Sequence, residues 1–337
     1  MGDERAVLVK EPVKGSAEEP AEGPGGEIDM GGVAGGESGL RCSDSALRAA
    51  RDLGAGCVVA HGFANRYALA SRADLVDVGR VNRLTGRPDG HVGSVTTVPS
   101  AIPGLFDWTL LPAELPRRQV RSLMEELYEL GPFGFRGPAA GWVPRHLTCV
   151  RDGVTTVRVV GPGRACPSNA FLGAALERTG ADLLFLAAAN RPHESPHWRA
   201  DGVVADFGHE SGVRVLPHPD DLAARRRYPH HEPVPTSVVS FHRPAGRGRS
   251  GLPALTLERH GSLSADHIRS VAANHGFALA VAPQAAGGRA VARAYAPPVA
   301  SVPPVVSVPP VPSVPSVPSV PSTPAVPAAA SVPAVRR

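Results

Sequence analysis

The feature that most constrains this chain is an imperfect Ser-Val-Pro repeat towards its C-terminal end. Residues 297–337 hold 13 of the 36 prolines in the chain. Proline lacks an amide hydrogen and fixes its φ angle, so this density excludes helices and sheets and favours extended polyproline II. We therefore expect residues 286–337 to form a disordered tail, which serves as a spacer or as a ligand for an aromatic groove.

Charge distinguishes the N-terminal part of the chain in a similar way. Residues 1–40 carry nine acidic and three basic residues without any apolar period, so we expect a disordered acidic head. Because this head contributes −6 to a formal charge of +4, residues 41–337 carry +10. The only lysines are Lys10 and Lys14, so the surplus is arginine. It suits an anionic ligand such as a nucleotide or RNA, or it reflects an arginine-rich surface.

Residues 41–285 have the patterning of one folded α/β domain. Short β-branched runs alternate with amphipathic segments that begin at Ser and end at Gly, which is typical of strands interleaved with capped helices. We expect helices at 43–53, 71–84, 117–130, 168–179 and 264–275, and strands at 57–61, 92–98, 154–160, 183–189, 202–207, 213–217, 236–241 and 254–258.

The cysteines and the apolar runs bear on the compartment. Cys42, Cys57, Cys149 and Cys166 have no regular spacing, which favours free thiols in a reducing cytoplasm. The chain has no basic start followed by an apolar segment, and the run Leu183–Ala189 is too short to span a bilayer. We expect a cytoplasmic protein without a membrane partner.

Two histidine patterns are compatible with metal binding. His193 and His197 are four residues apart, but in a proline-containing loop rather than a helix. His218 to Asp221 reads His-Pro-Asp-Asp, which resembles a zinc deacetylase motif, but no His-x-x-His follows it to complete the ligand set. We therefore predict no metal site.

Two segments in the first half of the domain place polar residues at the ends of predicted elements. CVVAHGFANRYALA, residues 57–70, is a strand followed by a turn that offers Asn65 and Tyr67. RVNRLTGRPDGH, residues 80–91, ends a helix and places Arg87 beside a proline. A cation is favoured at a helix C-terminus in any case, and a tyrosine after a strand is commonly packed in a core.

A third region runs from residue 142 to residue 192. WVPRHLTCV contains Thr148, and a strand with Arg158 then leads through a helix to a second strand. This second strand ends in Ala-Ala-Ala-Asn at Asn190. Because ligands of open α/β sheets lie beyond the carboxyl ends of strands, Arg158 and Asn190 are predicted to share a cleft. Asn190 also suits the simple role of capping a turn.

A fourth region carries hydroxyls and a further arginine. PTSVVSFH, residues 235–242, offers Thr236 and Ser237, and Ser240 follows two valines. The segment LTLERHGSLSADHIRS places Arg259 before a glycine and then a capped helix. Hydroxyls and backbone amides near such turns suit phosphate oxygens.

These four regions, in this order, resemble the YrdC-like family, the threonylcarbamoyl-AMP synthases. The resemblance implies a twisted mixed sheet flanked by helices, and synthesis of threonylcarbamoyl-adenylate and pyrophosphate from ATP, L-threonine and bicarbonate in tRNA modification. Magnesium would accompany ATP as part of the substrate, and no tightly bound cofactor is expected. The chain departs from the family pattern where Thr85 replaces a lysine, Ala188 a serine and Ser240 an aspartate.

The resemblance also assigns roles to individual residues. Arg87 and Asn190 would be catalytic, Tyr67 and Asn65 would line the amino-acid pocket, and Arg158, Thr148, Thr236, Ser237 and Arg259 would bind the nucleotide and its phosphates.

A second function remains open on the same scaffold. Losing a lysine and a serine removes charge-assisted hydrogen bonds worth about 1.5–3 kcal/mol each. Two such losses in the transition state would slow turnover by about two to four decades. The alternative is therefore a non-catalytic paralogue that binds a nucleotide or double-stranded RNA, with structured RNA or tRNA as the partner.

Overall fold

The computed structural model describes residues 43–192 and 194–285. The expected head at residues 1–40 and the tail at residues 286–337 lie outside the described residues, as does His193. The strands of the described part are β1 (Val58–Phe63), β2 (Arg66–Ser71), β3 (Ser94–Thr96), β4 (Phe133–Pro138), β5 (Thr148–Arg151), β6 (Val154–Gly161), β7 (Leu184–Ala188), β8 (Val213–Leu216), β9 (Val238–Ser240), β10 (Ala254–Arg259) and β11 (Ala278–Val281).

These strands form a single mixed sheet. Their order is β11-β10-β9-β4-β6-β3-β7-β2-β1-β8, and β5 pairs with β6. The pairs β1 with β8, β3 with β6, β4 with β9 and β10 with β11 are parallel, whereas the other pairs are antiparallel. The mixed α/β sheet expected from the sequence is therefore confirmed.

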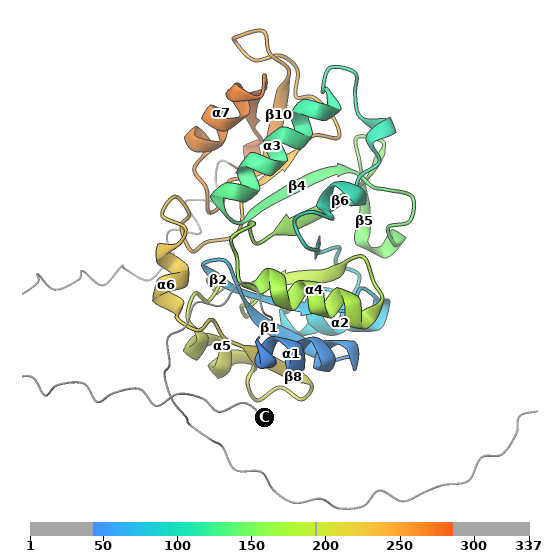
Figure 1. Ribbon diagram of the computed structural model, residues 1–337. Coiled ribbons are helices and arrows are strands. Elements are labelled where there is room, and N and C mark those ends of the chain that lie inside the picture. Colours follow the sequence, from blue (N-terminus) through green and yellow to red (C-terminus); the bar gives the residue numbers. More distant parts are fainter. Residues whose placement is uncertain (1–42, 193, 286–337) are drawn as a thin grey trace, which may run out of the picture.

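Helices flank this sheet near both of its ends. Figure 1 shows α3 and α7 beside β4 and β10, and α1 and α4 beside β1 and β2. The first pair of helices pack on each other, and so do the second pair. The helices of the described part are α1 (Asp44–Gly54), α2 (Leu75–Leu84), α3 (Arg117–Leu130), α4 (Ser168–Thr179), α5 (Ala200–Phe207), α6 (Asp221–Arg226) and α7 (Ala265–Asn274). None of them combines the length and apolarity that a bilayer span requires.

Helix α1 shows how the sequence pattern produces the packing. The Ser43 hydroxyl caps it by accepting a hydrogen bond from the amide of Ala46 at 3.3 Å. Ala46, Ala50 and Leu53 then recur at helical spacing, and all three are buried in one cluster with Phe171 of α4. The capped helix predicted for residues 43–53 is confirmed.

The cap of helix α2 lies three residues later than the sequence predicts, so the helix starts at Leu75 rather than at residue 71. Ser71 is the last residue of β2, and its hydroxyl donates to the carbonyl of Arg72 at 2.9 Å instead of capping a helix. Asp74 is the cap, and its carboxylate accepts from the amides of Val76 and Asp77 at 3.1 and 3.0 Å. Because β2 pairs with both β1 and β7, sheet pairing continues up to Ser71.

The strand predicted at residues 202–207 is wrong, since this segment lies in α5. Val203 and Phe207 are buried, a spacing that fits one face of a helix as well as one face of a strand. The deciding contact comes from far along the chain. The carboxylate of Asp221 accepts from the amide of Ala200 at 2.8 Å and so satisfies the start of the helix.

Strand β4 has no counterpart in the sequence-based expectations. It contains Gly134, Gly137 and Pro138, which normally argue against a central strand. The glycines are required by close packing, because a Cβ on Gly137 would lie 2.2 Å from the Phe241 ring and one on Gly134 would lie 2.9 Å from Val238. The strand places Arg136 in the middle of the sheet.

Candidate functional site

A cavity of about 270 Å³ lies among β2, β6, β7, β10 and the loop that follows α2. Four arginines from these separate elements line it, and we call it the arginine pocket: Arg66, Arg87, Arg158 and Arg259. None of its lining residues is acidic among those the structure describes. The remaining lining residues are Ala68, His91, Gly93, Ser94, Val160, Leu186, Ala187, Ala188 and Pro235.

Neutral acceptors hold three of these arginines in place. Nε of Arg158 donates to the Ser94 hydroxyl at 2.9 Å. Nε of Arg259 donates to the carbonyl of Thr236 at 2.6 Å, and Arg66 donates to the hydroxyl of the same threonine. The guanidinium groups are thus oriented by hydrogen bonds that leave their charge uncompensated.

Burial and mutual repulsion perturb the arginines of the pocket. Burial lowers the pKa of Arg66 and of Arg158 to about 10, and the charges of Arg136 and Arg87 add to the effect on Arg158. The pKa of Arg259 falls well below its ordinary value, first through burial and then through the other three pocket arginines. At a pKa of about 10, Arg66 and Arg158 stay protonated at neutral pH, so the pocket concentrates positive charge.

A histidine adds a titratable group to the same lining. The pKa of His91 is lowered, first by burial and then by the charges of Arg87 and Arg158. Without a bound anion His91 is therefore mostly neutral at pH 7, and one of its ring nitrogens can accept a proton when negative charge enters.

Thr236 and Ser237 support the pocket from behind. Both are fully buried. Thr236 bridges two pocket arginines, whereas the Ser237 hydroxyl donates to the carbonyl of Leu263 at 2.9 Å and accepts from two amides. The chain approaches so closely here that a Cβ on Gly261 would lie 1.8 Å from the carbonyl oxygen of Pro235. Close packing therefore requires a glycine at the last position of the Arg-x-Gly pattern.

The two residues predicted for an amino-acid pocket do not line the arginine pocket. The Tyr67 hydroxyl donates to Asp221 at 2.7 Å and accepts from the amide of His218 at 2.9 Å. The side-chain amide of Asn65 donates to the carbonyl of His231 at 3.0 Å. Tyr67 thus connects β2, and Asn65 the turn before it, to α6 and the residues that flank α6.

Asn190 and Thr148 also lie outside the pocket lining. The Asn190 amide donates to the carbonyls of Arg191 and Glu194 at 2.9 and 3.0 Å, so it closes the loop after β7. The Thr148 hydroxyl donates to the carbonyl of Arg145 at 2.9 Å at the start of β5. Of the nine residues predicted for the site, the structure gathers Arg87, Arg158 and Arg259 into one cavity.

Two of the three positions that depart from the family pattern, Ala188 and Thr85, differ in their surroundings. Ala188 lines the arginine pocket directly, so a serine there would present its hydroxyl to a ligand. Thr85 is buried, and its hydroxyl donates to the carbonyls of Val81 and Asn82 at 2.9 and 3.2 Å. Its side chain completes the last turn of α2 and does not reach the pocket.

Sequence reasoning missed Arg66. A signal was present, because this arginine lies in a mostly apolar segment of the sequence, and the structure buries every residue of β1 and β2. A charged residue in a buried strand is rarely tolerated unless it is paired or serves a ligand.

A larger cavity of about 890 Å³ adjoins the arginine pocket, because Arg158 and Arg259 line both. In this second cavity, which we call the sheet groove, two arginines, Arg136 and Arg243, have carboxylate partners. Nε of Arg136 lies 2.7 Å from a carboxylate oxygen of Glu258. The other lining residues are Val150, Arg151, Asp152, Val238, Ser240, His242, Arg243, Pro244, Ala245, Gly246, Thr256 and Gln284.

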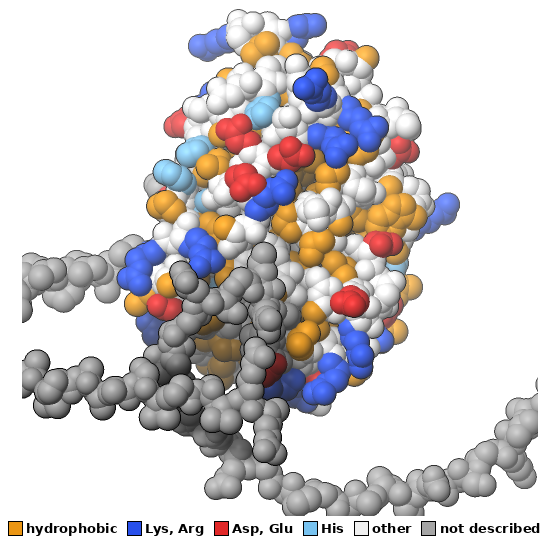
Figure 2. Space-filling model, viewed as in Figure 1, with side chains coloured by type: hydrophobic (Ala, Val, Ile, Leu, Met, Phe, Trp, Pro, Cys, Tyr) orange, Lys and Arg blue, Asp and Glu red, His pale blue; other side chains and the backbone are white. Residues whose placement is uncertain are grey.

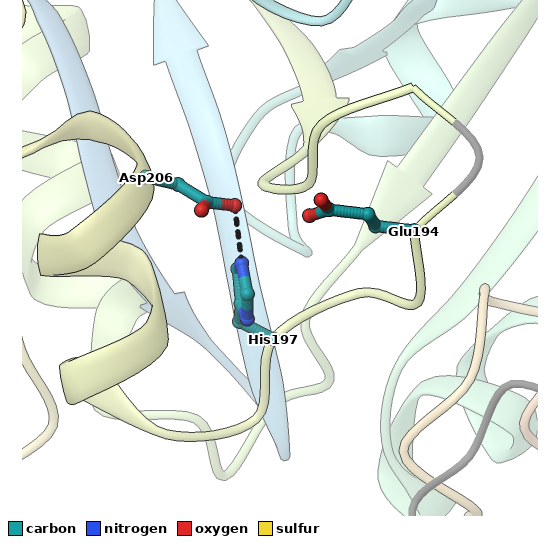
Figure 3. A group of neighbouring side chains, drawn as sticks. All are labelled: Glu194, His197 and Asp206. Atoms are coloured by element: carbon teal, nitrogen blue, oxygen red, sulfur yellow. Dashed lines mark hydrogen bonds and ion pairs between the residues drawn. The ribbon is translucent and has the colours of Figure 1, made fainter.

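One group of side chains has the composition of a metal site. Ligand atoms of Glu194, His197 and Asp206 lie within 4.8 Å of one another. Figure 3 shows these three side chains. Nε2 of His197 lies 2.6 Å from the Asp206 carboxylate, so these two form an ion pair or hydrogen bond on their own. The group lies outside the lining of both cavities, and an imidazole with two carboxylates suits a divalent ion such as zinc or manganese.

Comparison with known proteins gives matches in structure alone. No family model matches the sequence, and no curated protein matches it. The structure aligns with that of the hypothetical protein smu.1377c from Streptococcus mutans UA159, over 72% of this chain and 96% of that chain, at 13% identity and a TM-score of 0.53.

Two further matches are weaker. The crystal structure of P. abyssi Sua5 complexed with L-threonine aligns over 70% of this chain and 58% of that chain, at 20% identity and a TM-score of 0.47. Full-length HypF in a phosphate- and nucleotide-bound form aligns over 65% of this chain and 29% of that chain, at 18% identity and a TM-score of 0.45. This chain thus spans only part of either protein.

Sequence identities this low support a similarity of fold, but not a shared activity or ligand. The mixed sheet, the flanking helices and the match to nearly the whole of smu.1377c agree with the class expected from the four sequence regions. The described part of the chain therefore has a YrdC-like α/β fold.

Proposed function

We propose that the arginine pocket binds the phosphates of a nucleotide. The observation that carries this proposal is the convergence of four arginines, from elements far apart in sequence, on a cavity without an acidic lining residue in the described chain. Guanidinium groups bind phosphate oxygens through paired hydrogen bonds. A volume of about 270 Å³ suits a di- or triphosphate group, and the rest of the nucleotide extends out of the pocket.

The reaction we propose is synthesis of threonylcarbamoyl-adenylate from ATP, L-threonine and bicarbonate. Its support is the resemblance of the four sequence regions together with the position of Arg87, Arg158 and Arg259 in one cavity. Such chemistry depends mainly on positioning the reactants and neutralising developing charge, which these arginines suit. The product would serve the modification of tRNA.

Magnesium enters this proposal as part of the substrate. The described lining of the arginine pocket offers no carboxylate, and the carboxylate of Glu258 in the adjoining sheet groove is paired with Arg136. The ligands of a magnesium ion carried in by ATP would therefore be phosphate oxygens and water.

A second candidate is a protein that binds a nucleotide or double-stranded RNA without turning a substrate over. It is favoured by Ala188, which leaves a methyl group where the family pattern has a hydroxyl facing the pocket. On the face seen in Figure 2, the basic side chains lie in separate groups with acidic and apolar side chains between them. That face therefore offers no continuous basic path for RNA.

The test is calorimetric titration of ATP and pyrophosphate, with pyrophosphate release from ATP, L-threonine and bicarbonate measured in parallel. Arg87→Ala should weaken binding about 10- to 150-fold, which corresponds to about 1.5–3 kcal/mol for hydrogen bonds to a charged group. Arg118→Ala, which removes an exposed arginine of α3, is the matched control and should bind as the wild type does.

The two candidates give different results in this test. Binding accompanied by pyrophosphate release that requires threonine and bicarbonate supports the synthase. Binding without release supports the non-catalytic candidate. Absence of ATP and pyrophosphate binding at millimolar concentration, with no effect of Arg87→Ala, would remove the nucleotide site altogether.

A further inference from the structure

Three side chains of the sheet groove form a chain of hydrogen bonds that the proposed function does not use. The Ser240 hydroxyl lies 2.5 Å from Nδ1 of His242. The other ring nitrogen, Nε2, lies 3.2 Å from a carboxylate oxygen of Asp152. With the ring proton on Nε2 and directed to Asp152, Nδ1 is left to accept the hydroxyl proton of Ser240. This is the order of a nucleophile, its base and an orienting carboxylate.

The position of Asp152 is fixed by a tight turn. Arg151 pairs with Val154 across the β5–β6 hairpin, which leaves Asp152 and Gly153 as a two-residue connection. Both have positive φ angles, 48° and 79°, and Asp-Gly is the favoured sequence for such a turn. The second carboxylate oxygen of Asp152 accepts from Nη1 of Arg243 at 3.1 Å. The carboxylate is thus held from two sides.

The serine and the histidine come from one stretch of chain. Ser240 is the last residue of β9, and His242 follows two residues later, so their side chains are on the same side of the extended backbone. Pairing of Ser240 with Arg136 of β4 fixes the register of the strand that carries the serine. Ser240 and His242 are 1% and 6% exposed, yet both line the sheet groove, where a small acyl group can approach them.

We propose that Ser240, His242 and Asp152 form a nucleophilic site that hydrolyses carboxylic esters carrying an anionic group. The Ser240 oxygen bonds to the ester carbonyl carbon while its proton passes to Nδ1 of His242. The bond to the alcohol oxygen then breaks, and the departing alcohol takes that proton. Water next attacks the acyl-serine, gives its proton to His242 and releases the acid, and the proton returns to Ser240. The net reaction converts an ester and water to an acid and an alcohol.

The class of ester follows from the other charges in the cavity. Arg158 and Arg259 line the sheet groove beside the serine as well as the arginine pocket. A carboxylate or phosphate on the acyl part of the substrate would be held by them, and this would orient the carbonyl carbon towards Ser240. An ester without such a group lacks this contact. The site is therefore expected to prefer anionic acyl groups.

The experiment uses the full chain and three probes. A fluorophosphonate tests for an activated serine, and peptide mass spectrometry locates the adduct. Mono-p-nitrophenyl succinate and p-nitrophenyl butyrate are a matched pair of esters, with and without an acyl carboxylate. We expect one adduct, on Ser240, and hydrolysis of the succinate ester at least about tenfold faster than that of the butyrate ester. Ser240→Ala and His242→Gln should each lower turnover at least about 100-fold.

Asp152→Asn tests the orienting carboxylate separately. It should slow labelling and ester hydrolysis while leaving the preference for the succinate ester unchanged, whereas Arg158→Met should abolish that preference. Ser71→Ala and His275→Gln are the controls, because Ser71 is a buried serine of β2 and His275 pairs with Glu126 at 2.7 Å away from the groove. Both controls should match the wild type.

The proposal is overturned if the wild-type chain forms no adduct on Ser240, or if Ser240→Ala hydrolyses the succinate ester as fast as the wild type. The hydrogen bonds would then serve only to fasten the β5–β6 turn to β9. Because no nucleotide is present in this assay, its outcome is independent of ATP and pyrophosphate binding by the arginine pocket.

Discussion

The arginine pocket and the sheet groove adjoin each other, but their arginines have different kinds of partner. In the groove, Arg136 pairs with Glu258 at 2.7 Å and Arg243 pairs with Asp152 at 3.1 Å. In the pocket, Arg66 and Arg158 donate to neutral acceptors, and no carboxylate is among the described lining residues. Two arginines of the groove thus have carboxylate partners, whereas no pocket arginine has one among the described residues.

This difference separates arginines that stabilise the fold from arginines that are available to a ligand. Burying a charge without a partner is costly, so a protein normally supplies the counter-ion from its own chain, as it does for Arg136. Where several arginines are gathered and none receives a carboxylate, the missing counter-ion is best supplied by a ligand. Removing an arginine that has a carboxylate partner should therefore destabilise the fold, whereas removing one without such a partner should not.

The largest expected effect is on stability in the groove. Arg136→Leu should lower the free energy of unfolding by about 3–5 kcal/mol, because it leaves the Glu258 carboxylate without its partner in a largely buried place. Urea unfolding measures this change. Arg269→Leu, which removes an exposed ion pair with Asp266 on α7, is the control and should change stability by less than about 1 kcal/mol. Equal effects of the two variants would show that burial of the Arg136–Glu258 pair adds nothing to stability.

The next effect concerns the pocket and a ligand. At a pyrophosphate concentration 100 times the dissociation constant, the wild-type chain should gain about 2.7 kcal/mol in stability. Arg87→Met should lose this gain at the same concentration, yet be no less stable than the wild type without pyrophosphate, since it removes a like charge beside Arg158. Thermal melts with and without pyrophosphate measure both quantities. A marked loss of stability in the ligand-free variant would show that Arg87 has an internal partner.

The sequence predicted the elements whose signals are local. Helix α3 runs over Arg117–Leu130 as its apolar period and the following Gly131 indicate. Strand β4 was not predicted, because its glycines are explained only by contacts with Phe241 and Val238, which lie far along the chain. Tertiary contacts of this kind have no signature in a local window.

The same limit applies to the two cavities. The order of the motifs predicted Arg87, Arg158 and Arg259, which do line one cavity. It could not show that Thr236 accepts hydrogen bonds from two arginines. Nor could it pair His242 with Asp152, because 90 residues separate them and a hairpin turn brings them together.

A smaller effect is expected from restoring the family pattern. Ala188→Ser places a hydroxyl in the pocket and should tighten ATP binding by about 0.5–1.5 kcal/mol, or roughly 2- to 13-fold. Thr85→Lys should add a charge at the end of α2, and the two changes should couple if both groups meet one substrate. Calorimetry and pyrophosphate release give the readouts. Ala174→Ser on α4, outside both cavities, is the control and should bind ATP as the wild type does. If Ala188→Ser has no effect, the ligand does not reach β7.

The smallest effect is a dependence of anion binding on pH through His91. Its pKa lies below the ordinary value in the free protein because of burial, Arg87 and Arg158, and a bound anion should raise it. Binding then takes up a proton, so affinity should rise as the pH falls through the raised pKa and level off below the lowered one.

Sulfate is the suitable probe because it does not titrate in this range, and calorimetry between pH 8 and pH 5 gives the affinities. His91→Gln should remove this rise, which is expected to reach about tenfold. The same pH dependence in both proteins would mean that His91 does not sense the anion and that the arginines alone hold it.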